Sequence, residues 1–303
     1  MKRFMCLSAL LWASPVLADG AGEAKVDPKG EDDKVTEKAG GKFSLLGMEC
    51  KAEEEPGLET TPGSPPLDVD DPATPGCNGW EINIVTTGEF GKAMTGETPL
   101  FDINYGVGDN LQLKAEVPYE FTRIDGVSHT GLGRGELGLK YRFYEDDSRG
   151  LSIAVYPQLE FAIPGTAAAE GDQGVGTTTK LPLLLSTRIG ETSKGPVMVT
   201  ANLGYNHSTV PGSEDYVAAA VGVGFPVLSS VALMVETSTE QAVRRNMEDV
   251  RERYFKANVG VIGGISEHLL WFGSVGQTFA SSDMADSSHT CVSLGLRLIA
   301  GGP

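Results

Sequence analysis

The chain has 303 residues, with 24 Lys and Arg against 41 Asp and Glu, and its formal net charge is −17. This acidic balance argues against nucleic acid as a partner, because phosphate binding needs a cationic surface. With a mean hydropathy of −0.11 and no later apolar run of about 18 residues, the chain is not expected to cross a membrane by a helix.

The N-terminus has the order of a secretory signal. Lys2 and Arg3 precede an apolar stretch from Phe4 to Trp12, and compact residues around Ala18 offer a cleavage site. We therefore expect residues 1–18 to be a signal peptide that directs secretion through the inner membrane.

Residues 19–78 are rich in acidic, Pro and Gly residues; residues 19–76 alone hold 15 acidic and 6 basic side chains. So little apolar surface predicts a disordered acidic periplasmic tail. A disulfide between Cys50 and Cys77 fits an oxidising periplasm, but two cysteines in such a segment leave the question open. Cys291 lies on an alternating segment, where a small packed residue is expected rather than a reactive thiol.

A barrel domain is predicted from residue 79 to residue 303, because alternating apolar and polar residues recur from Trp80 onward. The twelve expected strands are 80–89, 99–106, 109–123, 133–144, 150–164, 177–189, 195–207, 215–226, 229–241, 253–264, 267–280 and 288–299. The connections after the even strands are short, for example 106–109 and 226–229, whereas those after the odd strands are mostly longer, for example 124–132, 164–176 and 242–252. Short inner turns and longer outer loops are typical of outer-membrane barrels whose termini face the periplasm.

Alternation within the strands predicts an apolar face toward lipid and a polar face toward a lumen. In segment 109–123, the apolar face carries Leu111, Leu113, Ala115, Val117, Tyr119 and Phe121, and the polar face carries Gln112, Lys114, Glu116 and Glu120. Threading the strands up and down also sorts the aromatic residues into two belts. We therefore expect an all-β, transmembrane, antiparallel up-and-down β-barrel of about twelve strands in the bacterial outer membrane, in contact with outer-membrane lipids, lipopolysaccharide and the barrel assembly machinery.

Four segments resemble the outer-membrane family labelled "MetA-pathway of phenol degradation". They are DINYGVGDNLQL at 102–113, VPY at 117–119, GLGRGELGLKYRF at 131–143 and PQLEFAIPG at 157–165. The resemblance implies a porin-like transporter of small, often aromatic compounds. The chain departs from the family at Arg134, where an Asp is usual, and at its C-terminus, which lacks the terminal aromatic residue of many barrels.

Inward charges from three consecutive strands are the candidate solute path: Lys114, Glu116, Glu120, Glu136, Lys140, Arg142 and Glu160. Such a patch tunes solute selectivity in an open barrel. Alternatively, these side chains fill a narrow lumen with ion pairs and water. By parity, Lys180, Arg188, Glu236, Lys256 and Arg297 also point inward, although their distance around the wall argues against a shared site.

No catalytic motif emerges from the sequence. Asn206-His207-Ser208 places a base beside a hydroxyl, but neighbouring residues on a strand point to opposite faces. We expect no enzymatic activity, catalytic residue, cofactor or metal. The leading hypothesis is passive diffusion or binding of small organic solutes, with loop 164–176 as a candidate constriction. A non-conducting structural or interaction barrel and, less favoured, an outer-membrane hydrolase are the alternatives.

Overall fold

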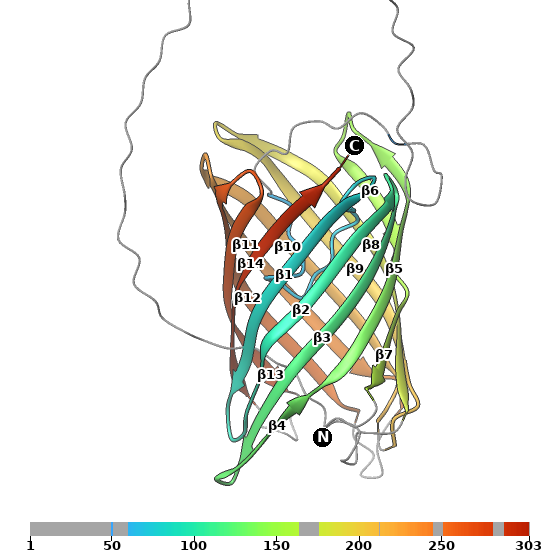
Figure 1. Cartoon of the computed structure of the whole chain (residues 1–303), viewed down its shortest axis with the longest axis vertical. Coiled ribbons are helices and arrows are strands. Elements are labelled where there is room, and N and C mark those ends of the chain that lie inside the picture. The colour runs from blue at the N-terminus through green and yellow to red at the C-terminus, as the bar shows by residue number, and fades with distance from the viewer. Residues whose placement is uncertain are drawn as a thin grey trace, which may run out of the picture.

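The computed structural model describes residues 50, 60–163, 176–211, 213–244, 251–280 and 288–302, and these form a closed antiparallel β-barrel (Figure 1). The strands are β1 Gly79–Phe90, β2 Met94–Gly108, β3 Leu111–Ile124, β4 Val127–Leu132, β5 Arg134–Asp146, β6 Leu151–Val155, β7 Gln158–Ala162, β8 Thr177–Thr192, β9 Gly195–Ser208, β10 Tyr216–Leu228, β11 Val231–Ala242, β12 Arg253–Ser266, β13 Leu269–Ala280 and β14 His289–Gly301. The predicted all-β barrel is confirmed. Within the described residues, no helix is long and apolar enough to span a membrane.

Fourteen strand segments make a wall of twelve strands, as predicted. β4 and β5 are successive parts of one wall strand, because both pair with β3. Likewise β6 and β7 both pair with β5 and with β8, and they are interrupted at Tyr156-Pro157. The barrel closes where β1 pairs with β14 over the full length of β1, from Gly79–Gly301 to Phe90–Thr290.

The two ends of the barrel differ in their connections. One end, here called the short-turn end, holds the start of β1, the end of β14 and the brief turns at 109–110, 147–150, 193–194, 229–230 and 267–268. All five predicted short connections are therefore present. The opposite, long-loop end includes residues 209–211, 213–215, 243–244 and 251–252, while residues 164–175, 212, 245–250 and 281–287 lie outside the described residues.

Two predicted long loops are instead hairpins at the long-loop end. β1 reaches Phe90 and β2 begins at Met94, so only residues 91–93 connect them. β3 runs to Ile124 and pairs back with β4 through Asp125-Gly126. Both turn residues have positive φ, 51° and 82°, the conformation that Asp-Gly adopts in the tightest hairpin turns. The sequence prediction was wrong here because it treated polar residues as loop, although polar strand extensions stand beyond the apolar band.

The wall has an apolar outside and a mostly polar inside, as the alternation predicted. On β5, Leu137, Tyr141 and Phe143 are about half exposed on the outer surface, at 50–51% of their area, whereas Glu136 and Lys140, which alternate with them, are buried. The aromatic pairs Trp80–Tyr105 and Phe255–Phe279, with ring centroids 4.6 and 6.3 Å apart, lie toward the short-turn and long-loop ends respectively. This is the surface of a barrel whose strands cross a membrane.

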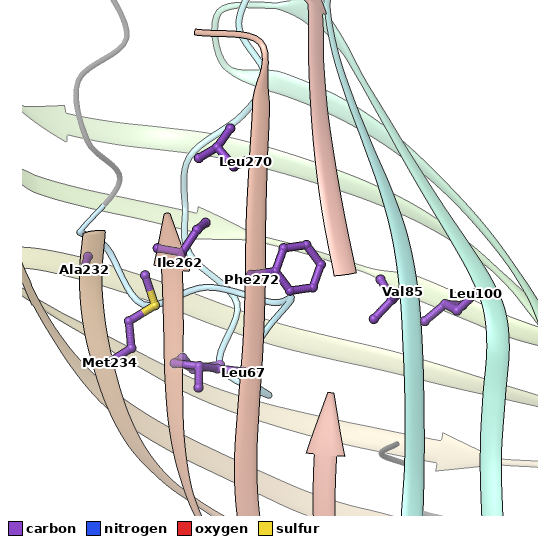
Figure 2. Packing of buried hydrophobic residues seen from close by; sticks show 9 residues of the cluster. Leu67, Val85, Leu100, Ala232, Met234, Ile262, Leu270 and Phe272 are labelled. Carbon is purple, nitrogen blue, oxygen red and sulfur yellow. The ribbon is translucent and has the colours of Figure 1, made fainter. Parts of the chain in front are cut away.

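The lumen contains an apolar cluster, which breaks the simple polar-inside pattern. Leu67 and Val69 pack there with side chains from five wall strands, namely Val85, Leu100, Ala232, Met234, Ile262, Leu270 and Phe272 (Figure 2). Both residues come from the stretch predicted to be a disordered tail. Burial of this apolar surface, with the hydrogen bonds described below, outweighs the entropy of ordering the chain.

Candidate functional site

Residues 60–78, here called the lumen segment, lie inside the barrel. The domain boundary expected at residue 78 was therefore wrong for these residues, whereas residues 1–49 and 51–59 lie outside the described residues. The segment contacts the wall in chain order: Thr60 and Pro62 lie against the glycines of β10, Leu67 against Gly260 of β12, and Gly76 against Gly106 of β2. It therefore forms a loop that enters the lumen at the short-turn end and returns there.

The apex of the lumen segment is held by hydrogen bonds to its backbone. Arg297 donates to the carbonyl of Pro65 at 2.9 Å, and Ser274 donates to the carbonyl of Pro66 at 2.9 Å. Glu236 accepts from the amides of Asp68 and Val69 at 2.8–3.0 Å. Buried wall side chains thus supply partners for peptide groups that have left water.

The returning limb is held in the same way. The side-chain amide of Asn202 both donates to and accepts from the backbone of Asp70, each at 2.7 Å. Lys140 donates to the carbonyl of Ala73 at 3.1 Å, and its ammonium lies 4.8 Å from the centre of the Tyr156 ring. At the apex, Lys256 forms an ion pair with the side chain of Asp68 at 2.8 Å.

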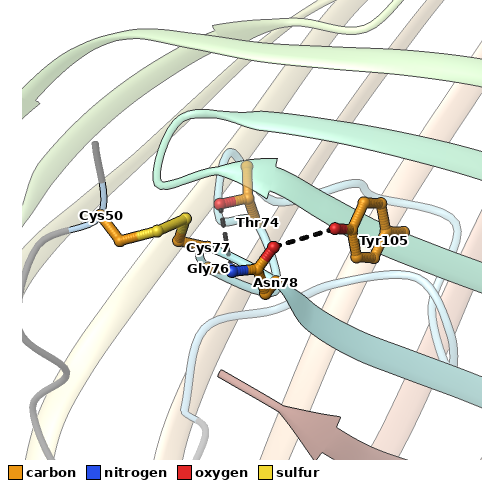
Figure 3. Close-up of a disulfide and its surroundings, with 6 residues drawn as sticks. All are labelled: Cys50, Thr74, Gly76, Cys77, Asn78 and Tyr105. Carbon is orange, nitrogen blue, oxygen red and sulfur yellow. Dashed lines mark hydrogen bonds between the residues drawn. A yellow bond between two sulfur atoms is a disulfide. The ribbon is translucent and has the colours of Figure 1, made fainter. Parts of the chain in front are cut away.

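A disulfide between Cys50 and Cys77 closes the loop that contains the lumen segment (Figure 3). The sequence alone did not decide whether this disulfide forms, and the structure contains it. Next to it, the hydroxyl of Tyr105 on β2 donates to the side chain of Asn78 at 3.0 Å, and the amide of Asn78 donates to the carbonyl of Gly106 at 2.9 Å. The end of the loop is thereby anchored to the short-turn end of the wall.

The predicted charge patch divides into three groups. Lys114 pairs with Glu116 and Glu136, both at 2.8 Å, and Lys180 links Glu136 at 2.5 Å to Glu160 at 3.6 Å. Lys140 instead holds the lumen segment. Arg142 binds Asn110 and the carbonyl of Asp109 in the short turn, and pairs with Glu145 at 2.6 Å.

Lys180 and Arg188, both expected to point inward, lie in different surroundings. Lys180 joins the site despite the distance expected around the wall, because β7 brings β8 within reach of β5. Arg188 lies at the exposed short-turn end and donates to the carbonyl of Ser148 at 2.8 Å. Arg134, the departure from the family pattern, is a site residue: it pairs with Glu160 at 2.5 Å. The side chain of Glu120 lies against Gly133.

Two cavities flank the lumen segment. The larger, of about 380 Å³, opens toward the long-loop end and is lined by Leu67, Glu116, Lys180 and Lys256, among others. The smaller, of about 190 Å³, lies toward the short-turn end between the returning limb and the wall, next to Thr74, Gln112 and Lys140. Both cavities share Ser64, Asp70, Asp102 and Lys114. These four residues, here called the junction, lie where the two spaces adjoin.

The junction is polar and combines two acids, Asp70 and Asp102, with one base, Lys114. Asp102 is buried and accepts hydrogen bonds from Asn83 at 3.0 Å and Asn104 at 3.1 Å. Burial raises the pKa of the Asp70 carboxyl above its ordinary value, while the ammonium groups of Lys140 and Lys114 oppose that shift. The larger cavity is lined by six acids, Asp68, Asp70, Asp102, Glu116, Glu136 and Glu240, against three bases, Lys114, Lys180 and Lys256.

Sequence reasoning missed the lumen segment, but a signal for it existed. The inward face of β10 carries Ala218, Ala220, Gly222 and Gly224, which leave room for another chain. A Cβ at Gly224 would collide with the carbonyl oxygen of Thr60, and one at Gly222 would lie 2.9 Å from Pro62. Small lumen-facing residues opposite a cysteine-flanked Pro-rich segment are thus the pattern to look for.

Solved structures that superpose on this chain include outer-membrane channels. An outer-membrane channel from Pseudomonas putida F1 superposes with a TM-score of 0.54 at 11% identity, over 77% of this chain and 98% of that one. The NanC porin superposes with a TM-score of 0.50 at 9% identity, over 72% of this chain and 98% of that one. At these identities the likeness establishes the fold. No protein-family model matches the chain, and no curated protein sequence does.

Proposed function

We propose that this chain is a passive outer-membrane channel for small organic solutes, with its short-turn end in the periplasm. The observation that carries the proposal is the pair of cavities on opposite sides of the lumen segment, which share the junction residues Ser64, Asp70, Asp102 and Lys114. A solute entering from the long-loop end meets the larger cavity first, passes the junction and reaches the smaller one. Channel function in the structural neighbours supports this reading.

The lining favours neutral or cationic solutes that have an apolar face. Six acids against three bases repel anions, and Pro66, Leu67, Val85 and Leu100 add apolar surface to the same cavity. Small aromatic molecules satisfy both conditions. This agrees with the sequence resemblance to the "MetA-pathway of phenol degradation" family, in which we place the chain as part of this proposal.

Electrical recording of the full-length refolded protein in planar bilayers tests the proposal. We expect discrete openings, and a reversal potential in a KCl gradient that reports preference for K⁺. Benzylammonium chloride and sodium benzoate, applied separately as gradients, compare an aromatic cation with an aromatic anion of similar size. Preference for the anion, or equal permeability, would contradict the assignment of solute class.

A second candidate function is a sealed barrel, with a structural or interaction role. The observation that favours it is the tight anchoring of the lumen segment by Glu236, Arg297 and Asn202. Deletion of residues 61–76 distinguishes the two functions. Steps seen only in the deletion variant would identify a sealed barrel, whereas steps in the wild type that enlarge on deletion support a channel constricted by the lumen segment.

A further inference from the structure

Three different metal-ligating side chains meet inside the barrel near its long-loop end. They are Glu89 on β1 and His289 and Cys291 on β14, and one carboxylate oxygen, one imidazole nitrogen and the thiol sulfur all lie within 4.8 Å of one another. The strand register explains the meeting: Glu89 is paired directly with Cys291. On β14, residues 289 and 291 point to the same inner face.

Polar atoms at and beside Glu89 are buried without a hydrogen-bond partner among the described residues. Its side chain is 9% exposed, and its Oε1 atom, 3.4 Å from His289 Nε2, has no hydrogen-bond partner among the described residues. Thr95, paired with Glu89 across β1 and β2, likewise has a buried hydroxyl without a hydrogen-bond partner in the described part of the chain. Buried polar atoms of this kind call for an explanation such as an ion or a water.

We propose that Glu89, His289 and Cys291 form a binding site for Zn²⁺. Carboxylate oxygen, imidazole nitrogen and thiolate sulfur are the three ligand types that this borderline-soft ion accepts. Ligand bonds of about 2.0–2.3 Å place neighbouring ligand atoms of a tetrahedral site about 3.3–3.8 Å apart. The observed spacing therefore needs only small side-chain rotations. Three protein ligands leave a fourth position for water or a solute.

The site lies beside the larger cavity, and the thiol of Cys291 has a polar neighbour. Thr87, two residues before Glu89 on β1, and Thr278, on the neighbouring β13, both line the larger cavity, so the site adjoins this cavity. The hydroxyl of Thr278 lies 3.4 Å from Cys291 Sγ. Lys256, whose charge also acts on Glu89, is paired with Asp68, which lowers its repulsion of an incoming metal ion.

The site lies at the seam where the barrel closes. β1 and β14 are the first and last strands, and their pairing closes the barrel. An ion held by Glu89 on one strand and His289 and Cys291 on the other cross-links this seam at its long-loop end. Because it binds the folded barrel alone, the ion stabilises closure in proportion to its concentration relative to its dissociation constant.

Titration of the refolded full-length protein with Co²⁺, with the disulfide intact, tests the proposal. We expect one ion per chain, a thiolate-to-cobalt charge-transfer band in the near ultraviolet, and displacement of Co²⁺ by Zn²⁺. Cys291→Ser should abolish the band. Glu89→Gln and His289→Asn should each weaken binding at least about tenfold, which is the effect of losing even an outer-shell partner of a metal site.

A matched control is His207→Asn. His207 and Asp215 form a histidine–carboxylate pair at 3.0 Å toward the same end of the barrel, and within the described part of the chain no thiol is among their hydrogen-bond partners. This variant should bind Co²⁺ as the wild type does. Binding without the thiolate band, a band that persists in Cys291→Ser, or equal weakening in His207→Asn would overturn the site. Heat-modified migration in gels, with Zn²⁺ or a chelator, shows that each variant is folded and reports seam stability.

Discussion

The carboxylate of Glu236 accepts a hydrogen bond from the backbone amide of Val69 at 2.8 Å, although 167 residues separate the two in the chain. This acid also accepts from the amide of Asp68. One buried carboxylate of the wall therefore fixes the apex of the lumen segment, and the width of the pore depends on how firmly such bonds hold it.

Glu236→Gln should loosen the apex of the lumen segment. The amide group of glutamine would place an N–H donor against the backbone N–H groups of Asp68 and Val69. Loss of a charged hydrogen bond costs about 1.5–3 kcal/mol. Faster hydrogen exchange at residues 67–70 and larger current fluctuations are expected. Glu191→Gln, on the exposed end of β8, is the matched control and should leave both unchanged. Unaltered exchange in Glu236→Gln would show that the apex is held by other contacts.

Removing the disulfide should free the lumen segment and leave the barrel folded. The bridge spans a sequence separation of 27 residues. In the entropic model, closing a loop of this length lowers the conformational entropy of the undocked chain by the equivalent of about 3–4 kcal/mol. The double variant Cys50→Ser, Cys77→Ser should therefore show more frequent large openings and faster exchange in residues 60–78. Reduction of the wild type should produce the same change. Equal open times before and after reduction would contradict this expectation.

Gly224→Val should exclude the lumen segment from its groove on β10. A Cβ there collides with the carbonyl oxygen of Thr60, so chain and wall cannot both keep their places. We expect higher conductance with little change in barrel melting, because the wall strand itself tolerates valine. The control is Gly264→Val on β12, where nothing lies within 4 Å of the added atom. If both variants conduct as the wild type does, the segment does not restrict the pore at that point.

Lys114→Met should increase the preference of the pore for cations. Lys114 neutralises Glu116 and Glu136, each at 2.8 Å, and borders both cavities. Breaking such a buried pair leaves uncompensated charge and costs about 3–5 kcal/mol, so thermal stability should fall too. Lys194→Met, in the exposed turn between β8 and β9, is the control. A lower melting temperature with an unchanged reversal potential would leave Lys114 a structural role alone.

Individual strands show which features of the fold could be predicted from the sequence. Leu111, Leu113, Val117 and their polar neighbours alternate with period two, and that pattern correctly assigned the outer and inner faces of β3. Turn residues such as Asp109-Asn110 and Ser229-Ser230 located the short connections. The hairpin at Asp125-Gly126 was missed, because polar strands beyond the apolar band lack the alternation by which strands are recognised.

The candidate site was predictable in part. Lys114, Glu116, Glu136 and Glu160 were assigned to one patch because parity placed them on one face of adjacent strands, and the structure joins them through Lys180. Parity does not give the position of a charge along the barrel. It therefore grouped Arg142 with the patch, whereas Arg142 binds the short turn.

The amino-acid sequence by itself determined the barrel, its strand number and which face of each strand meets lipid, since these depend on local alternation and on short turns. Only the tertiary structure decided what occupies the lumen. Residues 60–78 have too few apolar side chains to order themselves, and they become ordered because distant wall residues such as Glu236, Asn202 and Arg297 supply their hydrogen bonds. Contacts between parts of the chain so far apart leave no periodic trace in it.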